Sequence, residues 1–94
     1  MKKEFVEVPR ATLKFYKYEE DGLTFYEFDA TQSSPPEPMV NAMYGLNLLE
    51  NKNDRLVGIF FHEPSPLFDK TANIFHHEVQ ELPSGDVRVI FKKI

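Results

Sequence analysis

The chain has 94 residues, enough for one domain with one modest core. Hydrophobic residues at 41% and charged residues at 28% exclude a wholly disordered chain. The absence of cysteine excludes persulfide transfer, disulfide exchange and thiolate sites for zinc or iron–sulfur clusters. A net charge of −4 argues against a nucleic-acid partner, because such binding draws on the neutralisation of phosphates.

The start of the chain predicts β-structure. Phe5 to Val8 is expected to form a short edge strand that Pro9 ends. Residues 13–18 and 23–28 alternate between two faces, and Asp21-Gly22 between them favours a hairpin turn because both residues tolerate positive φ. We therefore expect a single domain, 1–94, in which residues 1–22 extend a core formed by residues 23–94.

Residues 31–38 predict a strand-to-helix junction, because the first turn of a helix tolerates proline. Ser34 and Glu37 have the spacing of a capping box. Apolar residues at helical spacing then predict a helix that ends near residues 51–53. These residues are Met39, Ala42, Met43, Leu46 and Leu49.

The second half predicts a central strand, a short helix and a hairpin. The run from Arg55 to Phe61 is apolar without alternation, as in a strand buried on both faces. Ser65 is expected to cap a helix from Pro66 to about Phe75, and residues 77–82 and 87–94 flank a turn at 83–86. A right-handed crossover makes the strands at 23–29 and 55–61 parallel. The predicted fold is an α+β two-layer sandwich, βαβαββ with an N-terminal β extension, with two helices on one face of a mixed four- to six-stranded sheet.

The segment Asp29 to Met39, DATQSSPPEPM, resembles the strand-to-helix junction of TusA/SirA-like sulfur-carrier domains. That junction has an Asp on the first strand and Cys-Pro-x-Pro at the start of the first helix, and the later landmarks agree in order over residues 23–94. In the family the cysteine carries the sulfur, whereas Pro35 stands at its position here. The resemblance implies the fold and an uncharacterised subfamily with Pro-Pro-Glu-Pro, and it implies no sulfur-carrier activity.

Polar residues gather at the two predicted strand-to-helix junctions. Ligands bind beyond the carboxyl ends of parallel strands in open α/β sheets, so the candidate binding residues are Ser34, Pro35, Glu37, His62 and Glu63. Helix capping alone also explains Ser34 and Glu37, and that alternative stays open. His76 and His77 are expected at the last turn of the second helix, far from His62, so we expect no metal site.

These observations favour a non-catalytic binding or adaptor domain whose partner is a protein. We expect no catalytic residue and no cofactor. We also expect a cytoplasmic location, since no apolar stretch is long enough to span a membrane. The alternative is a small-ligand or acid–base site with Glu37 and His62, related to sulfur-transfer or redox pathways. The chain is expected to be a monomer or a weak homodimer through its N-terminal edge strand.

Overall fold

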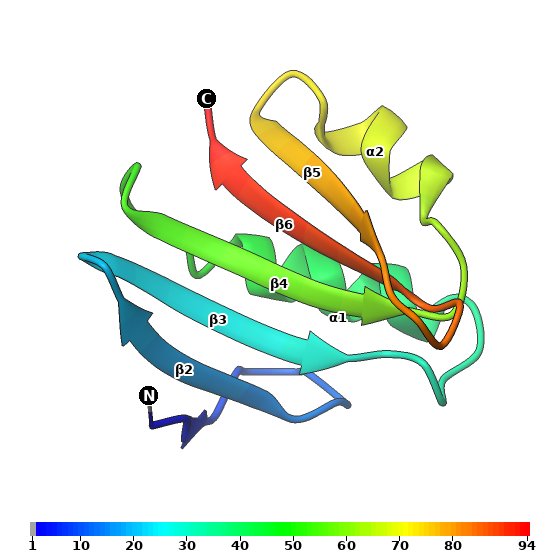
Figure 1. The fold of residues 1–94 in the computed structure, drawn as a ribbon, viewed down its shortest axis with the longest axis horizontal. Helices are drawn as coiled ribbons and strands as arrows, with labels where there is room; N and C mark the ends of the chain where they lie inside the picture. The colour runs from blue at the N-terminus through cyan, green and yellow to red at the C-terminus, as the bar shows by residue number, and fades with distance from the viewer. Residues whose placement is uncertain (1) are drawn as a thin grey trace.

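A six-stranded mixed sheet carries two helices in the computed structural model, which describes residues 2–94 (Figure 1). The strand order is β1-β2-β3-β4-β6-β5, and only the β3–β4 pair of this sheet is parallel. The elements are β1 (Glu4–Val6), β2 (Phe15–Glu20), β3 (Leu23–Asp29), α1 (Glu37–Leu46), β4 (Asp54–Phe60), α2 (Ser65–Thr71), β5 (Phe75–Glu81) and β6 (Val87–Lys93). The predicted α+β sandwich with an N-terminal β extension is confirmed.

The turn between β2 and β3 forms as the sequence predicts. Asp21 and Gly22 have φ values of 53° and 79°, in the left-handed region that two-residue hairpin turns require. Glu20 pairs directly with Leu23 across this turn, which sets the register of the whole hairpin. The central position predicted for residues 55–61 is also confirmed, because β4 lies between β3 and β6.

Both helices are shorter than their apolar spacing predicts. Helix α1 ends at Leu46, although Leu49 in the following turns is still buried. Helix α2 ends at Thr71, and Phe75, which was expected to end it, begins β5 and pairs with Lys93. Apolar spacing overestimates the length of a helix when a residue three or four places beyond its end contacts the same core from a turn or a strand.

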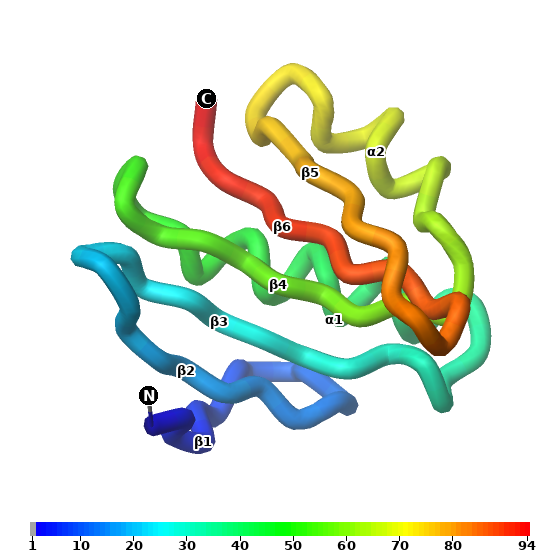
Figure 2. Tube along the Cα trace, viewed as in Figure 1, coloured from blue at the N-terminus to red at the C-terminus, as the bar shows by residue number. Residues whose placement is uncertain are grey.

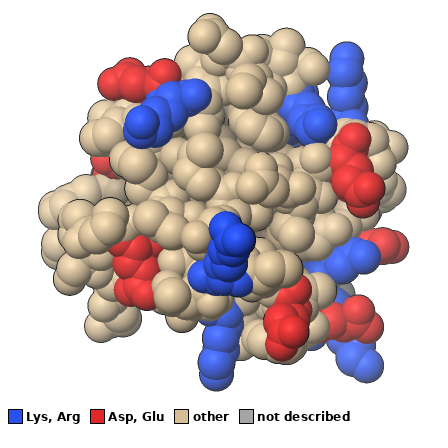
Figure 3. Space-filling model, turned by 180° about the vertical axis from the view of Figure 1, so that it is seen from behind, with Lys and Arg blue, Asp and Glu red and all other residues tan. Residues whose placement is uncertain are grey.

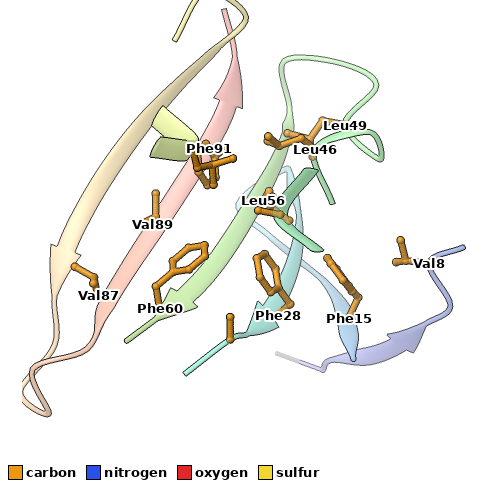
Figure 4. Packing of buried hydrophobic residues seen from close by; sticks show 13 residues of the cluster. Val8, Phe15, Phe28, Leu46, Leu49, Leu56, Phe60, Val87, Val89 and Phe91 are labelled. Carbon is orange, nitrogen blue, oxygen red and sulfur yellow. The ribbon is translucent and has the colours of Figure 1, made fainter. Parts of the chain in front are cut away.

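The core fills the space between the helices and one face of the sheet. Figure 4 shows side chains of four neighbouring strands projecting to the same side, among them Phe15, Phe28, Phe60 and Phe91. The cluster also includes Ala42 and Leu46 of α1 and Leu67 of α2. Both helices therefore cover the same face, as predicted.

The opposite face of the sheet has no helix over it among the described residues, yet some of its side chains are buried. The Tyr18 side chain is 6% exposed and stacks on Phe25 with ring centroids 4.9 Å apart. Its hydroxyl donates to Glu27 at 3.1 Å, and the Lys3 ammonium lies 5.3 Å from its ring centroid. Long neighbouring side chains thus shield this face in place of a second helical layer.

The N-terminal extension is built into the core. Phe15 of β2 is 1% exposed and stacks on Phe28 of β3 with centroids 4.9 Å apart. The amides of Thr12 and Leu13 donate to the buried Asn41 of α1, at 2.9 and 3.1 Å. Residues 2–22 therefore add more than an edge strand, because they supply part of the apolar interior.

The helices of residues 2–94 do not include one that is both long and apolar enough to cross a membrane. Helix α1, the longer of the two, has ten residues. A helix of that length extends about 15 Å, half the thickness of the hydrocarbon core of a bilayer.

Candidate functional site

A pocket of about 350 Å³ lies where the two predicted junctions meet, beside the N-termini of α1 and α2. Its floor includes Ala30, just after β3, and Phe60, the last residue of β4. These strands are parallel, so their carboxyl ends reach the same edge of the sheet (Figure 2). The lining residues are Ala30, Ser33, Pro35, Pro36, Pro38, Met39, Phe60, Phe61, His62, Glu63, Pro64 and Pro66.

The structure brings three of the five predicted binding residues to this pocket. Pro35 comes from the first junction, and His62 and Glu63 come from the second. Ser34 and Glu37 are not among the lining residues, although both lie close in sequence to residues that are. The structure therefore places three of these residues together at one edge of the sheet, and their role in binding stays a prediction.

The capping box predicted for Ser34 and Glu37 is wrong. The N-cap of α1 is Pro36, and no side chain caps the helix there. Instead, the Glu37 amide donates to the Ser34 carbonyl at 2.9 Å within a turn that contains a cis peptide bond between Pro35 and Pro36. Three prolines in four residues shape this turn, which leaves Ser34 in a different geometry from a capping residue.

The predicted capping role of Ser65 is also wrong, because this residue belongs to α2 itself. The N-cap is Pro64, again without a side-chain hydrogen bond, and the Leu67 and Phe68 amides donate to the Pro64 carbonyl. Both helices thus begin with a proline that presents a carbonyl and a ring. With proline at both N-caps the junction is apolar, whereas serine caps would have made it polar.

Glu37 has a structural partner away from the pocket. Its carboxylate accepts a hydrogen bond from the Thr12 hydroxyl at 2.5 Å, and its backbone carbonyl accepts one from the Asn41 side-chain amide at 3.0 Å. These contacts join the N-terminal extension to the first turn of α1. The structure does not bring Glu37 and His62 together around the pocket, so its geometry gives the acid–base alternative no support.

The pocket is apolar, whereas the sequence predicts a polar site. Five prolines, two phenylalanines, Met39 and Ala30 line it, and only three lining residues are polar. Phe60, the last residue of β4, is buried, whereas the next residue, Phe61, is 60% exposed. Two features of the sequence indicate this apolar pocket and were missed. They are the prolines at both junctions and Phe61, an apolar residue directly after the end of β4.

The other histidines lie away from the pocket, and their predicted place on the second helix is wrong. His76 and His77 belong to β5, where His76 pairs with Lys92 and His77 pairs with Phe91. The pocket lies near Phe60, which pairs with Val87 at the start of β6. The two histidines pair with residues near the other end of β6. Within residues 2–94 no three His, Asp or Glu side chains form a group able to hold a metal ion.

Acidic and basic side chains are interspersed on the side of the molecule where α1 lies. Figure 3 shows them separated by broad uncharged areas. Such a surface differs from the continuous basic stripe that binds phosphates.

Comparisons with protein-family models, with curated proteins and with solved structures gave no match to this chain. The relation to TusA/SirA-like domains rests on residues 29–39 and on the order of elements alone.

Proposed function

We propose that this chain is a non-catalytic binding domain that accepts an apolar side chain of a protein partner in the junction pocket. The observation that carries the proposal is the pocket itself, with a volume of about 350 Å³ and walls made mainly of proline, phenylalanine and methionine. A volume in this range suits one or two large side chains, and ligand pockets of proteins begin at about 300 Å³.

The stiffness of the walls supports this proposal. Proline rings have a fixed φ, so a pocket bordered by Pro35, Pro36, Pro38, Pro64 and Pro66 loses little conformational freedom when it is filled. Phe61 at the border adds an exposed aromatic ring. Rigid apolar pockets with an aromatic border are typical anchor points for partner proteins.

His62 and Glu63 give the pocket a polar border. Both are exposed, and the His62 ring lies against Phe61 with centroids 4.4 Å apart. In a protein interface such residues surround an apolar centre and orient the partner. This role needs no proton transfer, in keeping with the position of Glu37 outside the pocket.

The proposal includes a relation to the TusA/SirA-like family and a cytoplasmic location. The parallel β3–β4 pair and the antiparallel β5–β6 hairpin support the expected element order over residues 23–94. The edge where that family presents its cysteine here presents Pro35 and the pocket. On this view the domain kept a partner-binding edge and lost the nucleophile.

Site-specific crosslinking tests the proposal. A photoreactive phenylalanine analogue at position 61 should capture a partner from native extract, and the same analogue at position 5 serves as the matched control because Phe5 is also 60% exposed. The purified partner is then titrated against the wild type, Phe61→Ser and Phe5→Ser. We expect Phe61→Ser to weaken binding about tenfold or more, since aromatic anchors carry much of an interface's free energy.

Two further results decide between the alternatives. Glu37→Gln should bind the partner as the wild type does, because Glu37 does not line the pocket. If the partner binds Phe61→Ser and the wild type equally well, the pocket is not the docking site. A chemical turnover that His62→Ala or Glu37→Gln abolishes would favour the acid–base alternative instead.

A further inference from the structure

Strand β5 forms a long open edge of the sheet. It is the last strand in the sheet order and pairs only with β6, and residues 76–81 are all exposed. It contains no proline, glycine or lysine, the residues that commonly protect an edge strand. The other edge, β1, has three residues against seven in β5. Helix α2 covers the helix-side face of β5, where Phe68 stacks on His77 with centroids 3.8 Å apart, and it does not pair with the edge.

The backbone groups that face outward from β5 follow from its pairing with β6. Beside the closing turn, the Leu82 amide donates to the Asp86 carbonyl, and at the other end the Ile94 amide donates to the Ile74 carbonyl. Hydrogen-bonded and non-hydrogen-bonded pairs alternate in an antiparallel ladder, so even-numbered residues of β5 bond to β6. The amides and carbonyls of Phe75, His77, Val79 and Glu81 therefore point to the open edge.

Two copies of β5 that pair in antiparallel orientation place complementary side chains opposite each other. In an antiparallel pair of β5 strands centred on His77, Phe75 lies opposite Val79 of the second copy, and His76 lies opposite its Glu78. Each pair occurs twice because of the two-fold symmetry. His77 with its own copy and Phe75 with Val79 exchange backbone hydrogen bonds, whereas His76 and Glu78 form the non-hydrogen-bonded pair, where side chains approach most closely.

Neighbouring registers are less favourable. Centring the pair on Glu78 places two glutamates opposite each other at the closest position, which is destabilising. Centring it on Val79 places Phe75 opposite Pro83, which lies beyond the strand and has no amide to donate. The register centred on His77 avoids both problems, and it pairs Phe75 with Val79 and His76 with Glu78.

We propose that two copies of this chain associate through β5 in this antiparallel register and form one continuous sheet. The partner is a second copy for two reasons. In this register complementary side chains lie opposite each other, and the outward-facing amides and carbonyls of the two β5 strands meet. The interface is at the far edge of the sheet from β1 and uses no residue of the junction pocket. The association is weak and reversible, since five residue pairs bury little surface.

Charge exchange at the two closest positions tests the register. In sedimentation equilibrium of the full chain at several concentrations, we expect a monomer–dimer equilibrium for the wild type. His76→Glu replaces two imidazole–carboxylate pairs with two pairs of like-charged carboxylates, and the dissociation constant should rise about tenfold. The double variant His76→Glu with Glu78→Lys restores unlike pairs and should return the constant to near the wild-type value. Gln80→Lys, on the same face of β5, is the matched control and should change little.

Hydrogen exchange provides a second measurement that depends on no variant. The His77 and Val79 amides point outward, so they should exchange quickly in dilute protein and become protected as the concentration rises. The His76 and Glu78 amides bond to β6 and should be protected throughout. A strictly monomeric chain at every concentration would overturn the proposal, and so would a dimer that is insensitive to His76→Glu but lost in Phe5→Glu, which places the contact at β1. Neither result bears on Phe61 and the pocket.

Discussion

Asn41 is a buried polar residue of α1, and three of its four side-chain hydrogen bonds connect the helix to the N-terminal extension. It is 0% exposed, its oxygen accepts from the Thr12 and Leu13 amides, and its nitrogen donates to the Thr12 hydroxyl and the Glu37 carbonyl. In a small core such a fully paired amide specifies one arrangement of neighbouring segments. Asn41 thereby fixes where the N-terminal extension crosses α1.

Asn41→Ala should be strongly destabilising. The change leaves the Thr12 and Leu13 amides, whose hydrogen bonds are part-buried, without their acceptor inside the protein, and an unpaired buried group costs about 1–3 kcal/mol. We expect the free energy of unfolding, measured by urea denaturation, to fall by about 2–4 kcal/mol. Asn47→Ala, at an exposed position after the same helix, should change it by less than about 0.5 kcal/mol. Equal effects of the two variants would refute this role.

Tyr18 should give the protein an alkaline dependence of stability. Burial raises the pKa of Tyr18 above its ordinary value of 10.0, and the charge and hydrogen bond of Glu27 raise it further. The folded chain therefore holds the phenol proton more tightly than the unfolded chain does. Its contribution is complete below pH 10.0 and is lost as the pH rises through the pKa of the folded state.

Two variants test this dependence. Unfolding measured across alkaline pH should show a shallower loss of stability in Tyr18→Phe than in the wild type, because the phenol is absent. An NMR titration of the tyrosine ring carbons should show that Glu27→Gln lowers the pKa of Tyr18, since the negative charge of Glu27, one of its causes, disappears. An unchanged titration in Glu27→Gln would contradict the assignment of Glu27 as a cause.

At the scale of elements, α1 packs closely on the sheet at Gly45. A Cβ added there would lie 2.7 Å from Leu56 Cδ1 and 2.9 Å from Phe15 Cε2, which is too close for either side chain to stay in place. Gly45→Ala gains about 1 kcal/mol in helix propensity, but overpacking costs about 1–3 kcal/mol. We expect a net loss of up to about 2 kcal/mol by thermal or chemical denaturation.

A second substitution separates crowding from other effects. Leu56→Val removes part of the side chain that a Cβ at position 45 would meet. The double variant should therefore lose less stability than the sum of the two single variants, because the residues are in contact. Strict additivity would show that crowding against Leu56 is not the cause.

The sequence predicted the strands better than the helices. Asp21-Gly22 fixed the first hairpin through backbone preferences that act locally. The end of α2 was misplaced because Leu67, Phe68 and Phe75 all contact the core, and spacing alone does not distinguish a longer helix from a strand that returns to the same core. Short helices next to strands are the elements for which tertiary contacts decide the boundary.

The sequence predicted where the junction residues meet, but it did not predict the apolar character of the pocket there. Parallel strands at 23–29 and 55–61 were enough to locate the edge where Pro35, His62 and Glu63 meet. Serines in front of helices suggested caps, but the prolines became the N-caps and lined the pocket. Whether a polar residue near a helix start caps it depends on backbone angles that residue types alone do not determine.

At the scale of the whole molecule, the N-terminal 22 residues and the rest form one folding unit. The extension contributes Val8, Phe15 and Tyr18 to the buried hydrophobic residues. A chain reduced to residues 23–94 would expose Phe28 and leave β3 as a new edge. The division into an extension and a core describes the family resemblance and not an independently stable part.

Truncation tests this unity. Residues 23–94 alone should lack a cooperative unfolding transition and should show poor dispersion in an NMR amide spectrum, because removing the Phe15 ring alone typically costs about 3–5 kcal/mol. A chain that begins at Glu4 is the control and should keep the transition, since among the described residues it loses the ion pair of Lys3 with Glu27 and the contact of Lys3 with the Tyr18 ring. A folded, cooperative 23–94 fragment would contradict the prediction.

The position of Asn41 also links the junction pocket to the N-terminal strands. The first turns of α1 supply pocket residues such as Met39 on one side and hold Thr12 and Leu13 through Asn41 on the other. Anything that binds only when this part of α1 is in place must also favour the docked N-terminus, and by thermodynamic reciprocity the docked N-terminus must favour binding to the same degree. The N-terminal extension is in this sense an intramolecular effector of a pocket that it does not line.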